Sequence, residues 1–130
     1  MPSKLNNFIV ENRGKYLTDQ YGLWRGECVS LVKQWQKYNG WPICKGNAID
    51  WIKNGDGKNY RFIPNTPTFV PKGGDIVIFA TGKYGHIGVV YAADVKTMNV
   101  FQQNDPIGSP AKQKIYNYVK PHCLGFLRKI

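Results

Sequence analysis

The spacing of apolar residues changes from a helical to an extended period about halfway along the chain. The longest stripe of apolar residues at helical spacing consists of Cys28, Leu31, Val32 and Trp35, and residues of these types are usually buried. Its i, i+3, i+4, i+7 spacing predicts an amphipathic helix that begins at Cys28. The helix is expected to run to about Tyr38, because Asn39-Gly40 is a C-terminal signal. Shorter helices are predicted over residues 4–14 and 46–52.

The second half of the chain carries short apolar runs separated by turn residues, which is the pattern of a β-sheet. Asp75–Phe79 has the dense β-branched composition that is typical of a central strand. Residues 60–63 precede Pro64 and therefore predict a short or edge strand. Further strands are predicted over 86–91, 97–103, 115–119 and 124–127. Helices followed by an antiparallel sheet of about five strands predict an α+β fold in a single domain, residues 1–130.

The charge of the chain indicates an anionic partner. Eighteen Lys and Arg residues stand against eight Asp and Glu residues, which gives a net charge of +10. Nucleic acid, anionic lipid and a polyanionic cell wall all fit this balance, and charge alone does not choose among them. The first residues lack the apolar region of a secretory signal, and no apolar run approaches the ~18 residues that span a bilayer. We therefore expect no signal peptide and no membrane partner.

The cysteine pattern favours reduced thiols. Cys28, Cys44 and Cys123 are an odd number without a CxxC pair, which fits neither a disulfide framework nor a zinc site. Cys28 stands on the first turn of its predicted helix, where the macrodipole and the unpaired amides favour a thiolate. We therefore expect its pKa to lie below the value of a free cysteine. The alternative is that Cys28 is a small core residue.

Two histidines and a run of side-chain amides could complete a catalytic group. His86 opens a predicted strand directly after Tyr84-Gly85, so its side chain can point from the sheet edge toward a helix. His122 has no partner motif around it and is expected to be structural. The trio Gln102-Gln103-Asn104 ends the next strand. A helix-start cysteine, a strand-start histidine and a third polar group supply a nucleophile, its base and an orienting residue.

Taken in order, these motifs resemble the CHAP domain family, the cysteine- and histidine-dependent amidohydrolases and peptidases. The similar segments span about residues 18–128 and are Gly26–Val32, Gly46–Trp51, Pro71–Phe79, Tyr84–Val90, Phe101–Asn104 and Gly125–Leu127. The resemblance implies a papain-like (NlpC/P60-type) fold and a peptidoglycan hydrolase without a cofactor. The bond cut would be an amide, either that of an N-acetylmuramoyl-L-alanine amidase or a peptide cross-bridge.

The resemblance also assigns roles to residues. Cys28 would be the nucleophile, and His86 would hold the thiolate and then protonate the leaving amine. Gln102 or Asn104 would orient the imidazole; we favour Gln102. Strand alternation places both on one face and Gln103 on the other, where we expect it to be indifferent. Tyr21, Trp24 and Tyr84 are candidates for substrate binding, and ordinary packing is the alternative for each.

The chain departs from the family pattern at three positions. Glu27 replaces the Gln that often precedes the nucleophile, so its charge would oppose a developing oxyanion. Gln102 stands where the third-residue motif commonly begins with Glu. Of the acidic residues that bind calcium in some members, Asp19 alone remains, so we expect no metal site.

The implied partners are bacterial peptidoglycan and anionic wall polymers, and we expect a monomer that does not bind nucleic acid. The chain resembles phage lysins or virion-associated hydrolases, which would remain in the host cytoplasm until release or travel with the virion. Two rivals stay open. One is a non-catalytic basic module that binds wall or nucleic acid, since basic residues alternate with an aromatic ring at Lys53, Lys58, Tyr60 and Arg61. The other is a CHAP fold inactivated by Glu27 and Gln102. The chain is also compatible with a fragment of a larger lysin.

Overall fold

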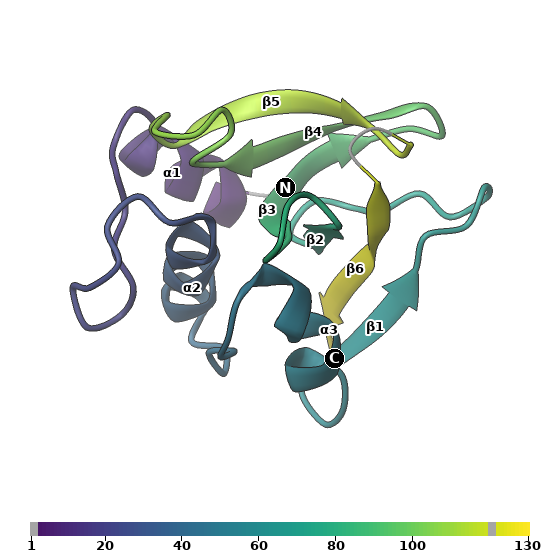
Figure 1. Ribbon diagram of the computed structural model, residues 1–130, viewed down its shortest axis with the longest axis horizontal. Coiled ribbons are helices and arrows are strands. Elements are labelled where there is room, and N and C mark those ends of the chain that lie inside the picture. The colour runs from purple at the N-terminus through teal and green to yellow at the C-terminus, as the bar shows by residue number, and fades with distance from the viewer. Residues whose placement is uncertain (1–2, 120–121) are drawn as a thin grey trace.

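The computed structural model describes residues 3–119 and 122–130. Four helical segments come first along the chain: α1 (Ser3–Asn12), α2 (Cys28–Asn39), the 3-10 helix η1 (Ala48–Asp50) and α3 (Trp51–Gly55). The strands follow: β1 (Tyr60–Pro64), β2 (Ile76–Phe79), β3 (His86–Ala93), β4 (Thr97–Gln102), β5 (Lys112–Asn117) and β6 (Cys123–Lys129). Figure 1 shows the helices gathered beside a strongly twisted sheet. The predicted α+β layout is confirmed.

The strands form one antiparallel sheet in the order β1-β6-β2-β3-β4-β5. β2 lies in the middle, and all four of its residues are buried, as its β-branched composition predicted. Among the strands of the described residues, β1 pairs with β6 alone and lies at one edge of the sheet, which confirms the edge-strand prediction for residues 60–63. The sheet therefore has six strands where about five were predicted.

Several element boundaries differ from the predicted ranges by one to three residues. Two of the differences follow from polar residues that give no apolar signal. The helix predicted over 46–52 begins later, since the Asp50 carboxylate accepts a hydrogen bond from the Asn47 amide and caps η1. β5 begins three residues earlier than predicted, at Lys112, which pairs with Gln102. Its alternating lysines give no apolar signal, so only pairing with β4 reveals this part of the strand.

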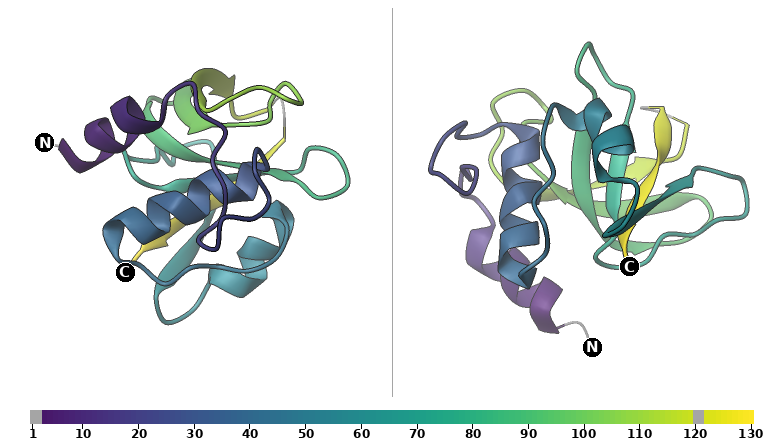
Figure 2. Two further views of the ribbon diagram at one scale, coloured as in Figure 1. Left: turned by 90° about the vertical axis from the view of Figure 1, so that its left-hand side faces the viewer. Right: turned by 90° about the horizontal axis from the view of Figure 1, so that it is seen from below.

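The apolar residues form one cluster on each face of the sheet. The first lies between the sheet and the helices and includes Phe8, Leu31, Trp35, Ile78, Ile87 and Phe101. The second lies on the opposite face and includes Val77, Phe79, Val100, Tyr116 and Phe126. Figure 2 shows α2 crossing the sheet on the helical side. Burial of the apolar residues of α2 holds this helix against β3. The packing thereby sets the position of Cys28, the first residue of α2.

Candidate active site

Cys28 is the first residue of α2 and lies against the beginning of β3. Glu27 precedes it with extended backbone and caps the helix without a side-chain hydrogen bond. The half-buried Cys28 sulfur interacts with the backbone N–H of Ile87, the residue that follows His86. Tertiary packing thus brings the predicted nucleophile and the predicted histidine motif together.

The protonation state of Cys28 differs from the prediction. Burial, together with a smaller contribution from the charge of Glu27, raises the pKa of its thiol to about 11. The amide donors of Ile87, Val29 and Cys28 itself lower the pKa, as predicted for a helix start, but burial outweighs them. The predicted direction was therefore wrong, because the apolar stripe that seats α2 also removes water from the sulfur. The resting cysteine is a thiol.

His86 is the first residue of β3 and is buried, with a fractional exposure of 6%. It pairs with Phe79 of β2, and the two rings stack with centroids 6.0 Å apart. Gly85 enters the strand with a φ of +79°, and a Cβ there would lie 2.9 Å from the Phe79 carbonyl oxygen. Only glycine fits this turn, so Gly85 determines where the imidazole enters the site.

The imidazole of His86 is bound by the side chain of Gln102. Its Nε2 lies 3.1 Å from the Gln102 Oε1. Because this oxygen can only accept, Nε2 carries the proton of the neutral ring and Nδ1 is left as the basic nitrogen. Burial lowers the pKa of His86, while the charge of Asp105 and the Gln102 hydrogen bond act in the raising direction. His86 is therefore neutral at pH 7.

Gly88 allows β4 to approach β3 closely enough for this hydrogen bond. A Cβ at Gly88 would overlap the Val100 side chain and lie 3.1 Å from both the Gln102 Cβ and the Phe101 carbonyl oxygen. The observed spacing of β3 and β4 therefore requires a residue without a side chain at position 88.

We expect Gly88→Ala to lower the free energy of unfolding by about 1–3 kcal/mol, because the added methyl group overpacks this contact. Denaturant unfolding would measure the loss. Ala92→Val is the control, since Ala92 is exposed on the same strand. A Gly88→Ala protein as stable as the control would contradict the close approach of the two strands.

Gln103 has a structural role that the sequence did not reveal. It points to the opposite face from Gln102, as predicted, but its side chain is fully buried. Its oxygen accepts from the Leu17 amide at 2.9 Å, and its nitrogen donates to the Leu17 carbonyl at 3.1 Å and the Glu27 carbonyl at 2.7 Å. The expectation that Gln103 is indifferent was wrong, because these bonds hold the segment that leads into Cys28.

Asn104 does not follow the predicted strand alternation. β4 ends at Gln102, and Asn104 lies beyond it with a φ of +71°. Its side-chain oxygen accepts a hydrogen bond from the Gly108 amide at 2.8 Å, which closes the following turn. The structure thus brings Gln102, and not Asn104, to the Nε2 of His86.

Asp105 is a residue near the histidine that sequence reasoning missed. Its carboxylate accepts hydrogen bonds from the Tyr116 hydroxyl and, at 3.0 Å, from Lys114. Its backbone carbonyl accepts from the Gln102 side chain at 3.3 Å. The available signal was an acidic residue that directly follows the amide trio.

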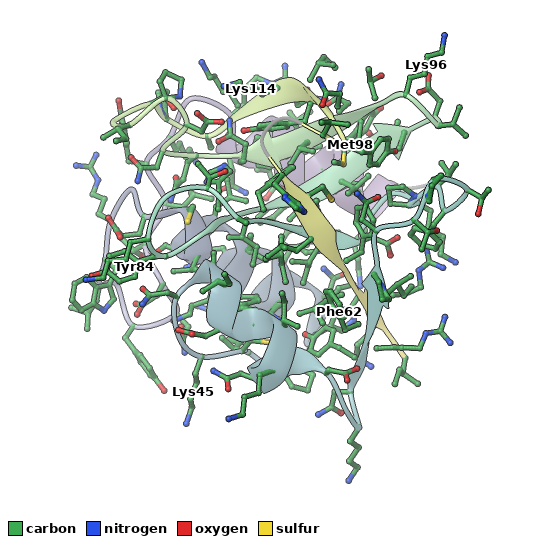
Figure 3. The ribbon with its side chains drawn as sticks, turned by 45° about the vertical axis from the view of Figure 1, so that its right-hand side comes forward. Lys45, Phe62, Tyr84, Lys96, Met98 and Lys114 are labelled. Atoms are coloured by element: carbon green, nitrogen blue, oxygen red, sulfur yellow. The ribbon has the colours of Figure 1, made fainter. Side chains whose placement is uncertain are left out.

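The three aromatic candidates for substrate binding are exposed, with fractional exposures of 79% for Tyr21, 67% for Trp24 and 54% for Tyr84. Ordinary core packing therefore does not explain them. Tyr84 extends outward from the molecule in Figure 3. Trp24 lines a pocket of about 290 Å³ that also includes both neighbours of Cys28; its lining residues are Trp24, Glu27, Val29, Lys33, Gly46 and Asn47. Neither Tyr21 nor Tyr84 lines this pocket.

A larger pocket of about 590 Å³ lies elsewhere, between the segment after β1 and the end of β5. Its lining includes Phe69, Lys96 and Tyr118 but none of the predicted site residues. Of these two pockets, the smaller one is lined by the chain neighbours of Cys28.

Asp19 shapes the loop before α2. Its carboxylate accepts hydrogen bonds from the amides of Tyr21 and Leu23, both at 2.9 Å. These bonds close the turn that presents Trp24, whose φ is +55°. Within residues 3–119 and 122–130, no group of three or more His, Cys, Asp or Glu side chains is placed to hold a metal ion.

A model of the CHAP domain matches residues 16–104, which is more than half of the chain. The chain belongs to the CHAP domain family. The match includes Cys28, His86 and Gln102, and it confirms the resemblance drawn from the sequence motifs.

Two phage proteins are similar to this CHAP domain in sequence. Endolysin LysK of Staphylococcus phage K is 33% identical over 96 residues, which cover 66% of this chain and 19% of LysK. Endolysin PlyTW of Staphylococcus phage Twort (strain DSM 17442 / HER 48) is 34% identical over 96 residues, which cover 67% of this chain and 21% of PlyTW. The matched region is thus about a fifth of the length of these relatives.

Solved structures share the fold. The crystal structure of the wild-type endolysin LysIME-EF1 matches with a TM-score of 0.74 and 25% identity, covering 96% of this chain and 62% of that one. The structure of Ly7917 with the hydrolysing product of MDP matches with a TM-score of 0.66 and 15% identity, covering 97% and 61%. The predicted papain-like fold is confirmed. No helix in the described part of this CHAP domain is long and apolar enough to cross a membrane.

Proposed function

We propose that this CHAP domain is a peptidoglycan hydrolase that cleaves an amide bond with Cys28 as its nucleophile. The observation that carries the proposal is the arrangement at the start of β3. There the Cys28 sulfur meets the Ile87 amide, and the adjacent His86 is held by Gln102. The similarity to two staphylococcal phage endolysins supports a cell-wall substrate.

The protonation states indicate a general-base mechanism in which the thiolate forms during attack. Burial keeps Cys28 as a thiol and His86 neutral. The Nδ1 of His86 takes the thiol proton while the sulfur attacks the scissile carbonyl carbon. The imidazolium then gives this proton to the leaving amine nitrogen as the C–N bond breaks. Water, activated by His86, hydrolyses the thioester and releases Cys28.

The helix start also supplies a donor for the tetrahedral oxyanion. The backbone N–H of Cys28 belongs to the first turn of α2, where amides have no partner within the helix. Glu27 is exposed beside it, and its charge disfavours the thiolate. Glu27 therefore opposes both anionic species of the reaction, which makes it a feature that slows this enzyme relative to one with glutamine there.

Mass spectrometry of fragments released from purified walls tests the proposed reaction. We expect products with a new amino group and no new reducing sugar, because an amide is cut and the glycan is not. A cut between N-acetylmuramic acid and L-alanine and a cut in the peptide cross-bridge give different fragment masses. Cys28→Ala is the control. New reducing ends, or no fragments from a folded wild-type protein, would contradict an amide hydrolase.

Wall adsorption is expected to depend on charge, because few cations are neutralised internally. Among the described residues only Lys114–Asp105 and Arg128–Asp75 form ion pairs. Four further carboxylates bind backbone amides and leave lysines free to face a polyanion; they belong to Asp19, Asp50, Asp56 and Asp94. The net charge of +10 is thus displayed to solvent.

We expect adsorption of the Cys28→Ala protein to purified walls to weaken steeply as salt rises past ~0.15 M, where the Debye length is about 8 Å. A sedimentation assay across salt concentrations would measure it. The double variant Lys53→Gln/Lys58→Gln removes two exposed positive charges and should show a shallower dependence. A flat curve for the Cys28→Ala protein would indicate a non-electrostatic binding site.

We also expect wall lysis to be independent of divalent metal, because the carboxylate of Asp19 already binds two amides of its own loop. Lysis would be measured after exhaustive EDTA treatment, with and without added calcium. Loss of lysis on chelation and recovery with calcium would overturn this expectation.

A further inference from the structure

A chain of polar contacts continues behind His86 and beyond Gln102. The Gln102 oxygen faces the His86 Nε2 at 3.1 Å, and the Gln102 nitrogen donates to the Asp105 carbonyl at 3.3 Å. The Asp105 carboxylate is in turn held by Tyr116 and by Lys114, whose position on β5 is marked in Figure 3. The centroids of the Tyr116 and His86 rings are 6.3 Å apart. The side chain that binds the Asp105 carboxylate therefore lies next to the imidazole.

We propose that Asp105 is the acidic positioning residue of this site: its carbonyl fixes the Gln102 amide, and its carboxylate stabilises the imidazolium that His86 forms during turnover. The inference rests on the proposed function. It addresses the neutral residue at position 102, where the family motif commonly has a carboxylate. The missing negative charge is thus supplied three residues later, from the loop after β4, without direct contact with the imidazole.

The site requires both the backbone carbonyl and the side-chain carboxylate of Asp105. A glutamine amide can rotate by half a turn and present its nitrogen, which would repel Nε2–H. The hydrogen bond to the Asp105 carbonyl excludes that orientation, because only the nitrogen of Gln102 can donate to it. The amide alone balances little charge, whereas a carboxylate nearby favours the cationic ring.

The charges around the ring support this assignment. The charge of Asp105 raises the pKa of His86, and the charge of Lys114 lowers it. Burial acts to raise the pKa of Asp105, but hydrogen bonds from Tyr116 and Lys114 and the charges of His86 and Lys114 together hold it below its usual range, so this carboxylate is ionised at neutral pH. The titratable groups that face this part of the site are Asp105 on the loop after β4, Lys114 and Tyr116 on β5, and Cys28 with Glu27 at the start of α2. β2 contributes the neutral ring of Phe79.

Titration of the two histidines by NMR tests the charge relation without requiring activity. In a Cys28→Ala background, His122 is exposed and serves as the internal reference. Asp105→Asn should shift the His86 titration to lower pH, and Lys114→Met should shift it to higher pH. Both variants break the same ion pair, so a purely structural role would move both titrations in the same direction. Asp94→Asn removes a charge from an exposed turn and should leave the titrations of both His86 and His122 unchanged.

Kinetics with active Cys28 test the consequence for the reaction. Asp105→Asn should lower kcat on the order of tenfold with little change in KM, a part of the ~10²–10⁴-fold that a positioned acid–base group contributes. Adding Gln102→Glu to Asp105→Asn should restore kcat, because it returns a carboxylate to the imidazole. Thermal unfolding checks that each variant is folded; should Asp105→Asn fail to fold, Asp105→Ser, which also removes the carboxylate, takes its place in the titration and the kinetics.

An unmoved His86 titration in folded Asp105→Asn, or equal shifts in Asp105→Asn and Lys114→Met, would overturn the role of Asp105. So would a double variant no more active than Asp105→Asn alone. Failure of the proposed hydrolase activity would instead appear as an inactive wild-type protein with the titration shifts intact.

Discussion

Replacing Cys28 by alanine, or His86 by alanine, is expected to lower the rate of wall lysis by ~10⁴-fold or more, the scale seen when a nucleophile or its base is removed. The Cys28 sulfur interacts with the backbone amide of Ile87, the residue next to His86 in the chain. Without its thiol no covalent intermediate forms, and without the imidazole the thiol keeps its proton. Turbidity loss of purified walls would measure the rates.

The matched controls are Cys44→Ala and His122→Ala, which should retain lysis. Cys44 is buried, and its sulfur accepts a hydrogen bond from the Gln36 side chain. Cys44 does not line the pocket beside Cys28. His122 is exposed. Because Cys44→Ala removes a buried contact, its activity is compared per folded protein. A folded Cys28→Ala protein that still lyses walls would rule out the thiol mechanism.

Gln102→Ala is expected to lower kcat by about 10²-fold, because His86 then loses the acceptor that fixes its tautomer. Gln102→Glu should retain or raise kcat, since a carboxylate stabilises the imidazolium better than an amide does. Steady-state kinetics on a soluble wall fragment would separate kcat from KM.

The neighbouring amides give the comparison. Gln103→Ala should lower the free energy of unfolding, because two buried hydrogen bonds and one partly buried hydrogen bond are lost, with a smaller change in kcat of the folded fraction. Asn104→Ala should affect mainly the turn closed by Gly108. If Asn104→Ala were crippling and Gln102→Ala near wild type, the orienting role would move to Asn104.

The prediction from sequence succeeded where a residue's role depends on its own segment. The helical stripe correctly began α2 at Cys28 and ended it before Gly40, because the periodicity and the stop signal are both local. The β-branched run of β2 and the proline that ends β1 likewise placed a central and an edge strand. Local order along the chain also sufficed to recognise the CHAP family.

The prediction failed where two distant segments determine one property. The Cys28 pKa is set by how deeply α2 is packed, and the amide donors of the helix start cannot offset that burial. Gln103 was considered indifferent because strand alternation tells which face a residue occupies, not what meets it there. Its partners, Leu17 and Glu27, are far from it in the chain.

The sequence by itself determined the order of the elements and the family, and it is the source of the proposal that Cys28 and His86 react. These follow from short-range periodicity, turn chemistry and motif order. Only the tertiary structure decided that Gln102 and not Asn104 faces His86, since β4 ends between them. It alone brought Asp105 into the site, because that contact depends on β5 carrying Lys114 and Tyr116 back alongside β4. Charges act through space, and their distances are set by strand pairing that residue order does not record.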